Sequence, residues 1–268
     1  MARPEPGITL VGGGRMGSAL AGGWIKANYA GPITIHDPQP SDLLTGWDAD
    51  GKIALNPTPA PASTLVVAVK PQVFGKIADE LRQHVGEQTL VLSIMAGITL
   101  ETLAETFGTR RVARAMPNTP GLVGKGMTLL CLPEDAAAED GDYLNELLTP
   151  LGEVEGPMGE DQISAATAIS GCGPAYAFLL AEVMAAAGKA HGLDEALALR
   201  LAKKTVEGAG ALMMASDEPP SRLRENVTSP GGVTKAALDV LMRADGMPSL
   251  MEKAVGAAIN RDRELSGD

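Results

Sequence analysis

The first half of the chain alternates short apolar runs with stretches of helical periodicity. Apolar runs occupy residues 8–11, 33–36, 65–69, 89–94, 112–116 and 127–131. Most of these runs are continuously apolar, which is typical of strands buried on both faces of a parallel sheet. Helical spacing occurs between them at 16–28, 73–84 and 100–107. This succession predicts βαβ units in a doubly wound, mostly parallel α/β sheet.

The pattern changes near residue 160, after which the sequence is rich in Ala, Leu and Met at helical spacing. We expect helices opening at Pro174, running from Asp194 to about residue 216, and covering 233–243 and 248–265. The Gly-, Pro- and Glu-rich stretch 152–159 resembles a link. We therefore predict an α/β domain over residues 1–156 and an all-α domain over 157–268.

Small residues recur on the helices of the second half, at 185–188 and 208–210. Such residues allow two helices to approach closely. They fit an intrachain bundle and the interface of a helical dimer equally well, because spacing alone does not separate the two.

Composition narrows the class of protein. The chain has 268 residues, 45% of them hydrophobic, and a formal charge of −11, which argues against nonspecific binding to nucleic acid or anionic membranes. Cys131 and Cys172 form no CxxC pair and favour a reducing cytoplasm. The three histidines are far apart in sequence, so we expect no metal site. We also expect neither a signal peptide in the first residues nor a membrane span.

A glycine-rich turn follows the first predicted strand directly. Residues 12–17 read GGGRMG, a GxGxxG pattern between a strand and a helix. Gly12 permits a tight turn, Gly14 lets a pyrophosphate approach the backbone, and Gly17 allows close packing of helix on strand. We expect these glycines, Arg15 and Met16 to contact a dinucleotide, which makes the first domain a Rossmann domain. The alternative is a glycine-rich turn without a ligand.

The second predicted strand ends at Asp37, 20 residues after Gly17. An acid at this place usually accepts a hydrogen bond from the ribose 2′-hydroxyl and repels a 2′-phosphate, which favours NADH. Arg15 could instead meet a phosphate, so NADPH stays open. Asp37 and Pro38 could also be a simple turn. We add Asn56 to the cofactor-binding candidates.

Three further strand ends supply candidates for the cofactor cleft, because ligands of open parallel sheets bind at the carboxyl ends of the strands. The alternatives are a solvated lysine at a helix start and, for the proline-rich loop, a purely structural turn. The candidates are Val69, Lys70, Pro71, Ala96, Gly97, Met116, Pro117 and Asn118.

The segment 227–234, VTSPGGVT, is the most chemically suggestive part of the second half. Free N–H groups at the start of the helix expected from Val233 would bind a carboxylate. Gly231 and Gly232 precede this helix, and Ser229 and Thr234 can add hydroxyl hydrogen bonds. The alternative is ordinary N-capping by Ser or Thr.

Taken together, the motifs resemble the pyrroline-5-carboxylate reductase family. They are residues 12–17, VKPQ at 69–72, MPNTP at 116–120, ISGCGPAY at 169–176 and VTSPGGVT at 227–234. The resemblance implies an N-terminal Rossmann domain, an all-helical dimerisation domain, and a homodimer that can form rings of dimers. It also implies reduction of L-1-pyrroline-5-carboxylate to L-proline by NAD(P)H. Arg15 and Cys172 depart from the Asn and Ser that are common there.

The same resemblance assigns roles in the C-terminal loop. The substrate carboxylate would bind at Ser229, Gly231, Gly232, Val233 and Thr234, and Thr234 would be the catalytic residue that hydrogen-bonds the imine nitrogen. Two alternatives remain. One is a β-hydroxyacid dehydrogenase with Lys203 or Lys204 as its base. The other is a nucleotide sensor that has lost catalysis.

Overall fold

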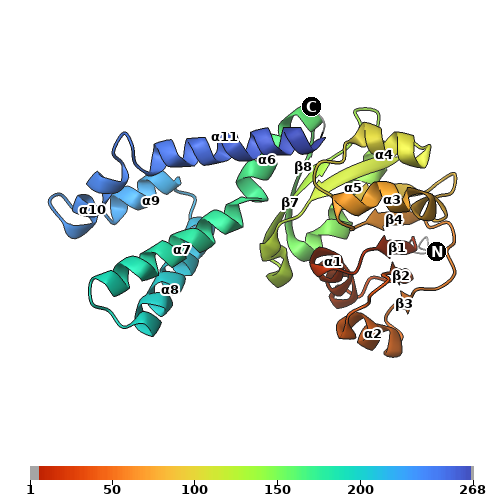
Figure 1. Ribbon diagram of the computed structural model, residues 1–268, viewed down its shortest axis with the longest axis horizontal. Coiled ribbons are helices and arrows are strands. Elements are labelled where there is room, and N and C mark those ends of the chain that lie inside the picture. The colour runs from red at the N-terminus through yellow and green to blue at the C-terminus, as the bar shows by residue number, and fades with distance from the viewer. Residues whose placement is uncertain (1–5, 267–268) are drawn as a thin grey trace. The chain divides into compact units, whose positions relative to one another are not determined.

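The computed structural model describes residues 6–266, which fall into two compact units (Figure 1). Unit 1 comprises Met1–Gly171 with Ile259–Asp268, and unit 2 comprises Cys172–Ala258. Residues 1–5, where we expect no signal-peptide core, lie outside the described part of the chain.

Unit 1 is built on an eight-stranded sheet with the order β3-β2-β1-β4-β5-β6-β7-β8. Neighbouring strands are parallel except that β7 runs antiparallel to β6. The order reverses between β1 and β4, the switch point at which open sheets bind ligands. The strands are β1 (Ile8–Val11), β2 (Ile33–His36), β3 (Ala54–Leu55), β4 (Thr64–Val67), β5 (Leu90–Ser93), β6 (Val112–Met116), β7 (Gly126–Cys131) and β8 (Gly152–Met158).

Helices cover both faces of this sheet. One apolar core joins β1 and β2 to Leu20 and Trp24 of α1 and to Leu144 of α5. The other joins β4 and β5 to residues of α3 and α4, including Phe74 and Leu103. The helices of unit 1 are α1 (Arg15–Lys26), α2 (Asp42–Ala49), α3 (Pro71–Arg82), α4 (Leu100–Phe107), α5 (Ala138–Leu148) and α6 (Glu160–Ser170), with short 3-10 helices η1 (Thr119–Val123) and η2 (Thr149–Leu151).

All of the regular secondary structure among the described residues of unit 2 is helical. Its α7–α8 hairpin closes where Gly188 packs on Ala198, since a Cβ on the glycine would lie 3.3 Å from the alanine Cβ. The helices are α7 (Gly173–Ala190), α8 (Glu195–Met214), α9 (Pro220–Asn226), α10 (Val233–Leu241) and α11 (Met247–Ser266), the last of which ends in unit 1.

The fold class expected from the sequence is confirmed: a mostly parallel α/β sheet is followed by helices. The expected link at 152–159 was wrong, because residues 152–158 form strand β8 paired with β7. The strand lies at the sheet edge and carries exposed Glu153 and Glu155, so its polar composition resembles a linker. The compact units divide at Gly171 and Ala258, not at residue 156.

One helical stretch bears on the expectation that the chain does not span a membrane. Glu160–Ala190 contains an 18-residue window with a mean hydropathy of 1.4, so the stretch is long and apolar enough to cross a membrane by length and composition alone. Gly171 and Cys172 form a turn that divides it into α6 and α7. A single stretch of this kind is weak evidence, and the absence of a span stays a prediction.

Candidate active site

The glycine-rich turn after β1 has the geometry that its sequence requires. Gly12 has φ +103°, and a Cβ there would lie 2.6 Å from the carbonyl oxygen of Ala68. A Cβ on Gly17 would lie 2.0 Å from the carbonyl oxygen of Gly12. Gly14, in contrast, has no atom within 4 Å of its Cβ position. Two glycines thus serve the packing of the loop, while the third borders open space.

Helix α1 begins immediately after Gly14, its N-cap, which provides no side-chain hydrogen bond to the first turn. The free N–H groups and the helix dipole make this start suitable for an anion. Arg15 is exposed at the same place, and within residues 6–266 no carboxylate forms an ion pair with it. Met16 follows, partly buried against the core.

Asp37 is bound directly to the glycine-rich turn. Its Oδ2 accepts a hydrogen bond from the N–H of Gly13 at 2.6 Å, and its Oδ1 accepts one from Gln39 at 2.8 Å. Asn56 brackets the Asp37 backbone through two bonds of 2.9 Å, one accepted by Oδ1 and one donated by Nδ2. The structure therefore places Asn56 as a support for Asp37, whose carboxylate lies beside the glycine turn.

The other cofactor candidates lie at the same edge of the sheet, because β1, β4, β5 and β6 are parallel and end together. Val69 follows β4, Lys70 is the exposed N-cap of α3, and Pro71 is its first residue. Ala96 and Gly97, the latter with φ +71°, lie in the loop between β5 and α4.

Met116, Pro117 and Asn118 leave the end of β6, with Asn118 buried. The Asn118 amide is already engaged at both atoms. Its Oδ1 accepts from the N–H of Met127 at 3.0 Å, and its Nδ2 donates to the carbonyl oxygen of Ser170 at 2.9 Å. These two bonds fix the orientation of the Asn118 side chain at the end of β6.

The loop 227–234 lies in unit 2 and leads into α10. Gly231 has φ +69°, and Gly232 is the N-cap, with no side-chain hydrogen bond to the first turn. The Ser229 hydroxyl lies at this helix start, since a Cβ on Gly232 would be 2.3 Å from its oxygen. Val233 is 90% exposed, and Thr234 is exposed as well. Neither Ser229 nor Thr234 caps α10, so ordinary N-capping does not explain these hydroxyls.

The hydroxyacid-dehydrogenase alternative from the sequence has no built site among the described residues. Lys203 and Lys204, the candidate bases of a hydroxyacid dehydrogenase, are exposed on α8, and Lys204 forms an ion pair with Glu207. Near Asp37, the rings of His36 and His84 are in contact, with centroids 4.5 Å apart and ring planes tilted by 49°. Burial lowers the pKa of both histidines, and the charge of His84 lowers that of His36 further. His84 is buried and His36 is partly buried, so the pair packs at the end of β2.

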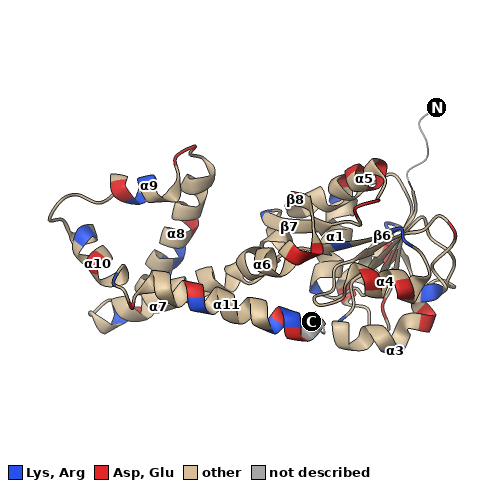
Figure 2. Cartoon of the chain, turned by 90° about the horizontal axis from the view of Figure 1, so that it is seen from above, with Lys and Arg blue, Asp and Glu red and all other residues tan. Residues whose placement is uncertain are grey.

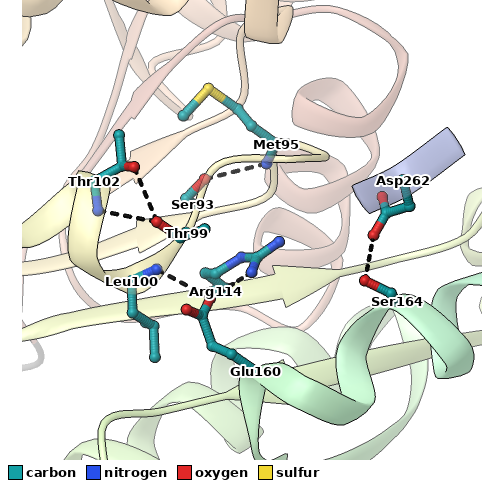
Figure 3. A network of polar contacts seen from close by, with 9 residues as sticks. All are labelled: Ser93, Met95, Thr99, Leu100, Thr102, Arg114, Glu160, Ser164 and Asp262. Carbon is teal, nitrogen blue, oxygen red and sulfur yellow. Dashed lines mark hydrogen bonds and ion pairs between the residues drawn. The ribbon is translucent and has the colours of Figure 1, made fainter. Parts of the chain in front are cut away.

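Sequence reasoning missed a buried ion pair at the carboxyl edge, between Arg114 of β6 and Glu160 of α6 (Figure 3). A charged residue within the apolar run VARAM was the only available signal, since its partner lies 46 residues later. Cys131 lies opposite Arg114 in the sheet, and burial followed by the charge of Glu160 raises the pKa of its thiol to about 11.

Comparison with known proteins finds relatives that match nearly the whole chain. A family profile described as "Pyrroline-5-carboxylate reductase dimerisation" matches residues 160–265, and one described as "NADP oxidoreductase coenzyme F420-dependent" matches residues 7–97. The pyrroline-5-carboxylate reductase of Pseudomonas aeruginosa is 35% identical over 266 residues, which cover 97% of each chain.

Solved structures agree with the sequence comparison. A pyrroline-5-carboxylate reductase from Coxiella burnetii superposes with a TM-score of 0.89 at 32% identity, covering 98% of this chain and 99% of the other. The Plasmodium falciparum pyrroline carboxylate reductase, solved with NADP bound, has a TM-score of 0.84 at 28% identity, with 99% and 100% covered. The chain therefore belongs to the pyrroline-5-carboxylate reductase family and is an NAD(P)-dependent oxidoreductase.

Proposed function

We propose that this chain reduces the C=N bond of L-1-pyrroline-5-carboxylate to give L-proline, the last step of proline biosynthesis. The observation that carries the proposal, beside family membership, is the uncapped start of α10 with the hydroxyls of Ser229 and Thr234 next to it. A cyclic imino acid has a carboxylate, which the start of α10 can bind, and a ring nitrogen, which can form a hydrogen bond with a hydroxyl group. Free cysteines support a cytoplasmic location.

Unit 1 fits the nicotinamide cofactor. The open space at Gly14 and the uncapped start of α1 suit a pyrophosphate. Asp37 would take the ribose, while Lys70, Ala96, Gly97 and the backbone of 116–118 would line the cleft. When bound, NAD(P)H supplies a hydride to the carbon of an imine. The chain itself must then orient the substrate and allow a proton to reach the ring nitrogen.

Unit 2 supplies groups for the substrate. The N–H groups at the start of α10 would bind the carboxylate, together with the Ser229 hydroxyl and the backbone of Gly231, Gly232 and Val233. The Thr234 hydroxyl would hydrogen-bond the ring nitrogen, which must gain a proton as the C=N bond becomes C–N. A threonine hydroxyl is a poor acid, so we infer that water or an already protonated iminium provides this proton.

NADH is the cofactor that we propose as preferred. Gly13 and Gln39 hold the Asp37 carboxylate beside the glycine-rich turn, where a negative charge would repel the 2′-phosphate of NADPH. The NADP bound to the Plasmodium relative and the exposed Arg15 support the opposite preference. Asp37→Ser should therefore raise kcat/KM for NADPH relative to NADH by about tenfold or more, since about 1.4 kcal/mol is one factor of ten. An unchanged ratio would contradict the role of Asp37.

We further propose that the chain works as a homodimer, with rings of dimers as a possible larger assembly. The matched dimerisation profile covers the helices of unit 2. Gly208 and Gly210 border open space, unlike Gly188, which packs on Ala198 within the chain. The small residues of α7 and α8 therefore serve both alternatives from the sequence: some close the hairpin, and others remain available for a second copy.

The direct test is the loss of reduced cofactor on mixing purified protein with pyrroline-5-carboxylate, measured separately with NADH and NADPH, with proline identified as the product. No loss with either cofactor, despite demonstrated cofactor binding, would contradict the reductase function and favour a sensor. Oxidation of a β-hydroxyacid instead would favour the dehydrogenase.

The role of Thr234 is tested by Thr234→Ala. Turnover should fall by about 100-fold, as for the loss of one positioned proton-handling group, with cofactor affinity unchanged. Thr228→Ala is the matched control, because the Thr228 hydroxyl already donates to the carbonyl oxygen of Arg224 at 2.6 Å. Equal turnover in the two variants would remove Thr234 from the mechanism.

A further inference from the structure

The buried pair at the carboxyl edge of the sheet joins three elements through one carboxylate oxygen. Glu160 Oε1 accepts hydrogen bonds from the Arg114 guanidinium on β6 and from the N–H of Leu100 at 3.0 Å (Figure 3). Glu160 is the first residue of α6, and Leu100 is the first residue of α4. The Arg114 side chain is 5% exposed and that of Glu160 33% exposed. One buried contact thus ties β6, α4 and α6 together.

The loop 94–99 is held at both of its ends by this network. At its start, the Ser93 hydroxyl accepts a hydrogen bond from the N–H of Met95 at 3.2 Å. At its end, Thr99 Oγ1 accepts from the N–H of Thr102 at 3.1 Å and caps α4. Glu160 then fixes the next residue, Leu100. Ala96 and Gly97 lie between these anchors, in the stretch that would line the cofactor cleft.

We propose that Glu160 and Arg114 are positioning residues that hold the 94–99 loop against the nicotinamide cofactor. The inference rests on the proposed cofactor site at Ala96 and Gly97. Neither side chain needs to touch the cofactor. Glu160 acts through the Leu100 N–H, and Arg114 acts by holding the Glu160 carboxylate in place.

The physical reason lies in the cost of burying charge. A buried ion pair often stabilises a fold no better than apolar side chains of the same volume would, whereas it does fix geometry. Arg114 lies opposite the fully buried Cys131, so the guanidinium has little water to replace its partner. We therefore expect the Glu160 carboxylate to remain bound to Arg114 and to the N–H of Leu100, which fixes the end of the 94–99 loop.

The same chain offers a matched control at the opposite edge of the sheet. Arg111, three residues earlier and just before β6, binds Asp140 of α5 through Nε–Oδ2 at 2.8 Å and Nη2–Oδ1 at 2.5 Å. This pair also includes a largely buried carboxylate, since the Asp140 side chain is 10% exposed. It lies at the amino edge, away from every cofactor candidate, so its loss should affect stability alone.

The experiment compares Glu160→Ala, Glu160→Gln and Asp140→Ala in cofactor titrations and steady-state kinetics, with thermal unfolding to verify folding. Glu160→Ala should raise the Kd and KM for NADH and NADPH about tenfold with a smaller change in kcat, the signature of lost cofactor positioning. Glu160→Gln keeps an acceptor for Leu100 and should recover most of the affinity. Asp140→Ala should lower the Tm and leave the cofactor Kd unchanged.

Equal Kd values for Glu160→Ala and Asp140→Ala would overturn the proposal. If Glu160→Ala does not fold, Arg114→Met carries the test, because it removes the cation that holds the Glu160 carboxylate. A folded Arg114→Met variant should show a raised cofactor Kd, and a wild-type Kd in it would overturn the proposal. Ala96→Leu separates this failure from failure of the proposed site. An unchanged Kd in Ala96→Leu would remove the 94–99 loop from the cofactor site, whereas a raised Kd there with a normal one in Glu160→Ala would reject the positioning pair alone.

Discussion

The two units of the chain differ in how they bury their apolar residues. Unit 1 has cores on both faces of its sheet, with large side chains such as Trp24, Leu92 and Leu103 fully buried. Among the described residues of unit 2, the only buried apolar side chains are Ala198 and Ala202. Helix α7 carries few charges (Figure 2), yet Phe178 on it is 66% exposed. Unit 1 therefore buries its large apolar side chains within one chain, whereas unit 2 leaves most of its own exposed.

This difference bears on function, because each unit carries one half of the proposed chemistry. The cofactor candidates lie on strand ends fixed by a buried sheet. The loop with Ser229 and Thr234 lies between α9 and α10, in neither of which a residue is buried. We infer that the substrate half is held firmly only when a second copy covers these helices.

The largest effect should follow from placing a charge on the exposed apolar face of unit 2. Phe178→Asp should weaken the dimer by about 3 kcal/mol or more, because an unpaired carboxylate would have to be buried in the interface. Sedimentation should then detect monomers at concentrations where the wild type is dimeric. Leu43→Asp is the matched control, since Leu43 is 50% exposed on α2 of unit 1. An unchanged assembly in Phe178→Asp would show that this face is not covered.

Within the self-contained unit, two glycines of one loop should respond differently to the same methyl group. Gly17→Ala places a Cβ against the Gly12 carbonyl oxygen and should cost about 3 kcal/mol of stability, as overpacking of a tight site does. Gly14→Ala meets open space, so the Tm should stay near that of the wild type.

Cofactor affinity gives a second test of Gly14, which borders the open space. Gly14→Ala should weaken cofactor binding by about tenfold, equivalent to about 1.4 kcal/mol, because the methyl group occupies the space proposed for the pyrophosphate. Fluorescence titration with NADH and thermal unfolding measure the two effects. A stable Gly14→Ala variant with wild-type affinity would contradict the phosphate site.

The smallest effect concerns the contacting rings of His36 and His84. Burial lowers the pKa of His36 and His84 below the ordinary value of 6.5, so the unfolded chain takes up protons more readily than the folded one. Their contribution is fully present above pH 6.5 and is lost as the pH falls toward the lowered values. His84→Asn should reduce the slope of stability against pH in this range by up to about 1.4 kcal/mol per pH unit, the limit for one proton.

Chemical unfolding at a series of pH values measures that slope. Trp24→Phe is the control, because it removes the hydrogen bond from the indole N–H to the Leu147 carbonyl oxygen without removing a titrating group. It should lower stability by about 1 kcal/mol equally at every pH. The same slope in His84→Asn and the wild type would exclude His84 as a titrating group of the folded core.

Features of the fold that depend on a few neighbouring residues could be predicted from the sequence. Continuous apolar runs located β1, β2 and β6 to the residue, and the glycine turn lay where GxGxxG predicted it. Asp194 and Gly232 also begin their helices as N-caps. Hydrophobic periodicity and turn chemistry decide these features within a few residues.

The features that the sequence did not predict depend on distant partners. Strand β8 is polar because it lies at an edge, and its pairing with β7 is invisible in its composition. Arg114 is buried only because Glu160 reaches it from another element. The Asn118 amide also joins Met127 to Ser170, a structural role that its place in the sequence does not reveal. The roles of the individual site residues stay predictions.

The most direct test of the central claim is the rate of cofactor oxidation with pyrroline-5-carboxylate, measured for the dimer and for a monomeric Phe178→Asp variant whose cofactor binding is verified. The account predicts rapid oxidation with proline formation by the dimer, and little by the monomer although its unit 1 still binds the cofactor. A monomer as active as the dimer would contradict the dependence of unit 2 on a second copy, and an inactive dimer would contradict the reductase function itself.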